Sequence, residues 1–183
     1  MNFFDKNNHF NLANSITFAN VACGTIALYF VTQKQFLVAI ILAWIAGALD
    51  IADGKVARKY NLSTEFGVQL DSFADFLSFV IMPAFLLFYS LDVTGFTKFI
   101  VGIIFVYYII SGLRRLVAFN LKTDAGSVSK YFEGVPTPLG AILLWILYLL
   151  SHTFEIITSP IIIAIFVAII GWLLNSKVKV PHP

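Results

Sequence analysis

Residues 36–57 read FLVAIILAWIAGALDIADGKVA, and this segment sets the class of fold. A helix needs roughly 20 mostly apolar residues to cross a bilayer, and the segment has that length, with two aspartates near its end. Over the whole chain of 183 residues, 59% are hydrophobic and 12% are charged, about half the charged share of a soluble domain. The sequence therefore predicts an integral membrane protein in contact with the lipid bilayer. Its net charge of +2 gives no reason to expect nucleic acid as a partner.

Six apolar runs of this kind predict an all-α protein with six transmembrane helices. They cover Ser15–Val31, Phe36–Ala57, Phe66–Ser90, Phe96–Phe119, Val135–Leu150 and Ile156–Leu174. No second domain of normal size fits beside them, so residues 1–183 are expected to form a single transmembrane domain. The one cysteine, Cys23, allows no internal disulfide and no cysteine-based metal site.

Lysine and arginine are distributed unevenly over the two sides that six helices would create. Ten lie on the side that holds both termini and the loops after the second and fourth helices: Lys6, Lys55, Arg58, Lys59, Arg114, Arg115, Lys122, Lys130, Lys177 and Lys179. Only Lys34 and Lys98 lie on the other side. Because cytoplasmic loops carry the excess of positive charge, we expect both termini in the cytoplasm and a multi-pass protein of the cell membrane.

Four of the ten acidic residues lie close together, at the cytoplasmic ends of the second and third predicted helices. Asp50 and Asp53 are three positions apart, and Asp71 and Asp75 are four apart, so each pair shares one helical face. Four carboxylates at this depth would repel each other, and two divalent cations would cancel their charge. Oxygen ligands suit Mg²⁺, Mn²⁺ or Ca²⁺, and a pair of such ions is typical of phosphoryl displacement.

Pairing with neighbouring basic residues is a reasonable explanation for one such acid but not for four. Ionisable groups within a membrane are costly and usually functional. A small cation-coupled transporter would also place acids within the membrane, so this class stays open as the non-enzymatic alternative.

The complete motif extends from the second helix into the third. It reads Asp50-Ile-Ala-Asp53-Gly54-Lys-Val-Ala57-Arg58, then eight residues, then Gly67-Val-Gln-Leu-Asp71-Ser-Phe-Ala-Asp75. This order, D-x-x-D-G-x-x-A-R followed by G-x-x-x-D-x-x-x-D, resembles the signature of the CDP-alcohol phosphotransferases at every fixed position. The resemblance implies a six-helix fold whose active site faces the cytoplasm, a CDP-lipid substrate and a homodimer.

The family motif also implies roles for single residues. Asp50 and Asp71 would bridge two Mg²⁺ or Mn²⁺ ions. Asp53 would bind one ion and Asp75 the other, and Asp75 would also act as the general base. Further contacts to the CDP-lipid are expected from Asp53, Gly54, Ala57, Arg58, Thr64 and Gly67, with Arg58 suited to a phosphate oxygen.

Three other segments are similar to the membrane-embedded phosphatidylserine synthases within this family. The first helix contains Asn14-Ser-Ile-Thr17-Phe-Ala-Asn20-Val-Ala-Cys23-Gly24, similar to N-x-x-T-x-x-N-x-x-C-G. The segment Phe132-Glu-Gly134-Val-Pro136-Thr-Pro138 resembles F-x-G-x-P-[ST]-P, and Arg115-Leu-Val-Ala118-Phe119-Asn120 resembles R-L-A-R-F-N with Ala118 in place of the second arginine. The resemblance implies L-serine as the acceptor. It adds Asn14 and Thr17 to the CDP-lipid contacts, and Arg114, Arg115, Asn120 and Lys130 as candidate acceptor contacts.

Other acceptors and other enzymes fit the sequence less well. Glycerol 3-phosphate or inositol phosphate would undergo the same chemistry but would need a larger anion pocket, and the Cys23-Gly24 and Pro136–Pro138 segments argue against them. Intramembrane prenyltransferases also pair aspartates with Mg²⁺, but they lack the D-G-x-x-A-R element. The lipid itself, CDP-diacylglycerol or CDP-archaeol, is not distinguished by the sequence.

Overall fold

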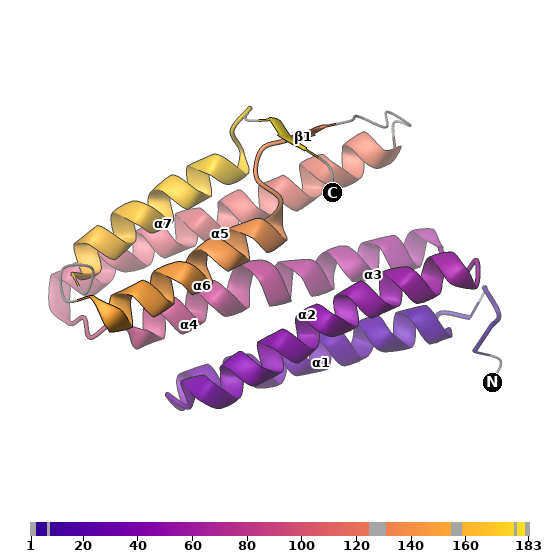
Figure 1. Ribbon diagram of the computed structural model, residues 1–183, viewed down its shortest axis with the longest axis horizontal. Helices are drawn as coiled ribbons and strands as arrows, with labels where there is room; N and C mark the ends of the chain where they lie inside the picture. Colours follow the sequence, from indigo (N-terminus) through magenta and orange to yellow (C-terminus); the bar gives the residue numbers. More distant parts are fainter. Residues whose placement is uncertain (1–2, 7, 125–130, 155–158, 178, 182–183) are drawn as a thin grey trace. The chain divides into compact units, whose positions relative to one another are not determined.

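The computed structural model describes residues 3–6, 8–124, 131–154, 159–177 and 179–181 and is mainly helical (Figure 1). Its helices are α1 (Leu12–Thr32), α2 (Phe36–Lys59), α3 (Glu65–Asp75), α4 (Met82–Ser90), α5 (Gly95–Asp124), α6 (Thr137–Thr153) and α7 (Pro160–Leu174). A π-helix, η1 (Phe76–Ile81), joins α3 to α4, so that helical structure continues over Glu65–Ser90. The predicted helical architecture is therefore confirmed.

Among the described residues, four helical segments are long and apolar enough to cross a membrane, namely Leu12–Thr32, Phe36–Lys59, Glu65–Ser90 and Gly95–Leu121. The two remaining helices, α6 and α7, are apolar but shorter, with 17 and 15 residues. Large apolar side chains are exposed on the longer helices, for example Leu37 and Trp44 on α2 and Phe96 on α5. A water-soluble monomer rarely exposes so much apolar surface, so the surface fits contact with lipid.

Two details of the fold differ from the expectation. Two short strands, β1 (Tyr131–Glu133) and β2 (Lys179–Pro181), pair in antiparallel register, with Phe132 opposite Val180. From the sequence, we expected helices alone. The start of the last helix was predicted at Ile156, which lies outside the described residues, and α7 begins at Pro160.

The chain forms two compact units, Met1–Ser78 and Phe79–Pro183. In the first unit, α1 packs along α2 and α3. The turn that ends α2 brings the chain back toward α2. In this turn Asn61 adopts a left-handed conformation with φ 54°, and the Leu62 amide donates to the Ala57 carbonyl oxygen at 2.9 Å. This is the Schellman pattern of hydrogen bonding, and asparagine is one of the few residues that tolerates its left-handed position.

In the second unit, the segment before α6 is fixed against the end of α7. The Val135 amide donates to the Leu173 carbonyl oxygen at 3.2 Å. Gly134 has φ +89°, and a Cβ atom there would lie 2.6 Å from the carbonyl oxygen of Leu174. Only glycine fits this position, because the backbone is left-handed and another main chain is in close contact.

Candidate metal and nucleotide site

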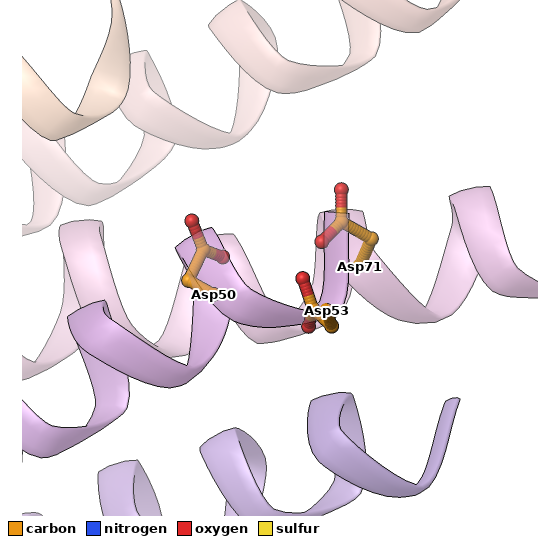
Figure 2. Close-up of side chains that lie close together, drawn as sticks. All are labelled: Asp50, Asp53 and Asp71. Carbon is orange, nitrogen blue, oxygen red and sulfur yellow. The ribbon is translucent and has the colours of Figure 1, made fainter. Parts of the chain in front are cut away.

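The α2 and α3 helices bring three of the four predicted aspartates together (Figure 2). Asp50 and Asp53 come from α2 and Asp71 from α3, and one carboxylate oxygen of each lies within 4.8 Å of the others. Asp75 lies one helical turn after Asp71, and its carboxyl group is a hydrogen-bond partner of Asp50. The structure therefore gathers all four side chains around Asp50, as the spacing of the two pairs predicts.

The Asp53 carboxylate is the most enclosed of the three clustered groups. Its side chain is 4% exposed, and its Oδ2 atom has no hydrogen-bond partner within the described part of the chain. A buried carboxylate oxygen without a partner is costly unless it is paired with a charge or coordinates a metal. The residues thus fit a hard divalent cation, because they offer several oxygen ligands at close range and one of these oxygens is unsatisfied.

A cleft of about 190 Å³ opens beside the aspartates in the first unit. All eight residues predicted to contact the CDP-lipid line it: Asn14, Thr17, Asp53, Gly54, Ala57, Arg58, Thr64 and Gly67. Asp71 also lines the cleft, so the cleft shares two of its carboxylates with the aspartate cluster. The other lining residues were not predicted from the sequence: Ala13, Leu62, Ser63 and Val68.

The glycines of the motif keep the walls of the cleft open. A Cβ atom on Gly67 would lie 2.9 Å from Asn14 Oδ1 and 3.2 Å from Thr64 Oγ1. Thr64 caps α3, because its hydroxyl oxygen accepts from the Gly67 amide at 3.0 Å. On α2, a Cβ atom on Gly54 would lie 3.4 Å from Arg58 Nη1. The exposed Arg58 guanidinium therefore folds back over Gly54 at the cleft.

The predicted acceptor contacts belong to the second unit. Arg114 is exposed on α5, whereas Arg115 is 7% exposed and donates to the carbonyl oxygens of Val135 (3.2 Å) and Gly134 (3.4 Å). Arg115 thus joins two of the motifs that the sequence analysis singled out separately. Asn120 is half-buried near the end of α5, and Lys130 lies outside the described residues.

Asn20 is a site residue to which the sequence analysis gave no role. It is fully buried on α1, and its Nδ2 atom donates to Asp50 Oδ1 at 3.4 Å. The signal in the sequence was its place in the first-helix motif, between Thr17 and Cys23, but the motif alone does not reveal which side chain Asn20 meets.

The apolar helices, the cleft and the aspartate cluster together indicate a membrane-embedded protein with a candidate ligand cleft beside carboxylates that fit a divalent cation. The chain belongs to the CDP-alcohol phosphatidyltransferase family, whose model matches residues 10–174, and this confirms the resemblance found in the motif. Among similar proteins is the CDP-diacylglycerol–serine O-phosphatidyltransferase of Bacillus subtilis, 33% identical over 168 residues, which are 91% of this chain and 88% of that protein. Proteins of the same name from Helicobacter pylori and Methanocaldococcus jannaschii are 27% and 29% identical, over 92% and 93% of this chain and 71% and 73% of their own length.

Proposed function

We propose that this protein is an enzyme of phospholipid synthesis that transfers a phosphatidyl-type group from a CDP-lipid to the hydroxyl of L-serine and releases CMP. The observation that carries the proposal is the cleft, which is lined by the eight residues expected to contact the CDP-lipid and, through Asp53 and Asp71, by two carboxylates of the aspartate cluster. Serine as the acceptor is supported by the names of the relatives, which come from bacteria and an archaeon. The lipid is proposed to be CDP-diacylglycerol or CDP-archaeol.

The proposed topology has six transmembrane helices in one domain of the cell membrane, with both termini and the active site facing the cytoplasm. The distribution of lysine and arginine supports it. At about 1.5 Å per residue, α6 and α7 are shorter than the roughly 30 Å hydrocarbon core. Flanking residues and local thinning of the bilayer accommodate such a mismatch at modest cost. A homodimer, which the family resemblance implies, is part of the same proposal.

The aspartates would hold two divalent ions, Mg²⁺ or Mn²⁺. Asp50 and Asp71 would contact both ions, Asp53 one and Asp75 the other. When bound, such ions stabilise the negative charge that develops on the transferred phosphate and on the departing CMP.

The side chains of the chain itself would carry the remaining steps. Asp75 would accept the proton of the serine hydroxyl, and the serine oxygen would form a bond to the phosphorus that carries the lipid. The bond from that phosphorus to CMP breaks, and Asp75 later returns its proton to solvent. Arg58 would hold a phosphate oxygen through its planar fork of donors, while Gly54 and Gly67 leave room for the nucleotide.

The serine carboxylate needs a positively charged contact, and the candidates are Arg114, Arg115 and Lys130, while Asn120 is a candidate for a neutral polar contact to the acceptor. Arg115 already donates to two main-chain carbonyl oxygens, so part of its guanidinium group is used to hold the main chain before α6. Arg114 is exposed, and a bidentate grip on a carboxylate suits its geometry. We therefore propose Arg114 as the first candidate of the three.

A CMP-release assay tests the proposal and its alternatives together. The full chain is purified in detergent and given CDP-diacylglycerol, Mg²⁺ or Mn²⁺, and one alcohol at a time: L-serine, glycerol 3-phosphate or inositol phosphate. We expect CMP release that depends on L-serine. Faster release with glycerol 3-phosphate would contradict the acceptor but keep the chemistry. If no alcohol causes CMP release, and proteoliposomes that contain the protein take up a solute when a cation gradient is applied, a transporter would be favoured.

A further inference from the structure

Asn20 connects α1 to an aspartate of α2 and to a serine of η1. Its Nδ2 atom donates to Asp50 Oδ1 at 3.4 Å, and its Oδ1 atom accepts from Ser78 Oγ at 2.7 Å. Both Asn20 and Ser78 are buried, at 0% and 6% exposure. A buried asparagine with both ends engaged is a fixed contact, because breaking either hydrogen bond would leave a polar atom without water or partner.

The chemistry of the two partners sets the orientation of the Asn20 amide. An ionised carboxylate only accepts hydrogen bonds, so the amide nitrogen must face Asp50, and the amide oxygen then faces Ser78. The Ser78 hydroxyl donates to that oxygen at short distance and holds the amide in this orientation. Two consecutive hydrogen bonds therefore connect Ser78 to Asp50 through Asn20.

The backbone around this contact is built for close approach. Gly24 lies one turn after Asn20 on α1, and a Cβ atom there would be 3.0 Å from Ser78 Oγ and 3.2 Å from Leu77. Glycine within a helix is less favourable than alanine, so its presence here fits a requirement for contact with η1. The π-helix η1 begins directly after Asp75, and such widened turns are frequent at functional sites.

We propose that Asn20, held by Ser78, is a positioning residue that aims the Asp50 carboxylate at the bound cation. The inference rests on the proposed function, because it assigns Asn20 a task at the metal site. Partners that orient a metal ligand typically affect metal affinity by roughly 10–100-fold. A residue that serves only to pack α1 against α2 and η1 would change stability and leave metal affinity unchanged.

The test measures Mn²⁺ binding to the full chain in detergent, using the electron paramagnetic resonance signal of free Mn²⁺, beside thermal unfolding. The variants are Ser78→Ala, Asn20→Leu and their combination. Ser78→Ala is the milder change, because it removes one oxygen and keeps the helix intact. The matched control is Thr25→Val on α1, since Thr25 is exposed and, within the described residues, its hydroxyl donates to the Val21 carbonyl oxygen of its own helix.

We expect both single variants to weaken Mn²⁺ binding by roughly 10–100-fold, and Thr25→Val to bind as the wild type does. The double variant should be no weaker than Asn20→Leu, because residues that act as a unit are not additive. Unchanged Mn²⁺ affinity in Ser78→Ala, with or without a lower melting temperature, would overturn the positioning role. A wild-type protein that binds no Mn²⁺ would overturn the metal site of the proposed function, and the role of Asn20 with it.

Discussion

Substituting Gly67 by alanine tests whether the cleft holds the nucleotide, because the new methyl group would enter the cleft itself. The added Cβ atom would lie 2.9 Å from Asn14 Oδ1 and 3.2 Å from Thr64 Oγ1. Neither neighbour moves freely. Asn14 Nδ2 donates to the carbonyl oxygen of His9 at 3.0 Å, and Thr64 Oγ1 caps α3 through the Gly67 amide. Relieving the contact therefore costs one of these hydrogen bonds.

The effects on stability and on binding differ in size. A lost cap or hydrogen bond costs about 1 kcal/mol, and alanine is favoured over glycine in a helix by about the same amount. The melting temperature of Gly67→Ala should therefore change little. One extra carbon in a fitted pocket is worth about 1–3 kcal/mol, so CDP affinity should fall by roughly tenfold or more.

Calorimetric titration of CDP into the detergent-purified protein with Mn²⁺ measures this difference. Gly102→Ala on α5 is the matched control, because a Cβ atom there would have no neighbour within 4 Å among the residues that the structure describes. It should leave CDP affinity unchanged. If Gly67→Ala folds normally and binds CDP as tightly as the wild type, the cleft beside the aspartates is not the nucleotide site.

Three further predictions concern single residues of the site and the fold. Arg58→Lys should raise the KM for CDP-lipid by roughly tenfold, the equivalent of one charge-assisted hydrogen bond of about 1.5 kcal/mol. Unchanged KM and kcat would mean that Arg58 serves only as a positive charge that sets the membrane topology. Asp75→Asn should bind CDP nearly normally, while CMP release falls by roughly 10²–10⁴-fold, as for a lost general base. Asp71→Asn should weaken Mn²⁺ and CDP binding as well. Near-normal turnover in Asp75→Asn would contradict its role as base. Gly134→Ala should lower the stability of the fold by about 1–3 kcal/mol, because φ at this position is positive and the new Cβ would meet the Leu174 carbonyl oxygen. Thermal unfolding in detergent measures this loss. An unchanged melting temperature would contradict the expected backbone strain.

Much of the site follows from local sequence. Helical spacing places Asp50 with Asp53 and Asp71 with Asp75, and the turn at Asn61 lets the two helices return beside each other. Because both aspartate pairs and the glycines lie within one helix-turn-helix, a motif of fixed spacing is enough to predict their meeting. The family was predicted from the same motif, whereas the helical class was predicted from the long apolar runs.

Contacts between distant segments could not be predicted in this way. Asn20 meets Ser78 across 58 positions, and no periodic pattern marks a hydrogen bond between two helices. The pairing of β1 with β2 joins residues at register Phe132–Val180, in strands too short to show an alternating pattern. Arg115 resembled a substrate contact in sequence, yet two of its donors fix the main chain before α6.

The most direct test of the proposed chemistry follows the serine oxygen into the lipid. The purified protein is given CDP-diacylglycerol, Mn²⁺ and L-serine that carries heavy oxygen in its hydroxyl, and the lipid product and CMP are analysed by mass spectrometry. If the serine hydroxyl attacks the phosphorus, the heavy oxygen appears in the phosphoserine lipid and is absent from CMP. A protein that forms no serine lipid, or a serine lipid without the heavy oxygen, would contradict the account.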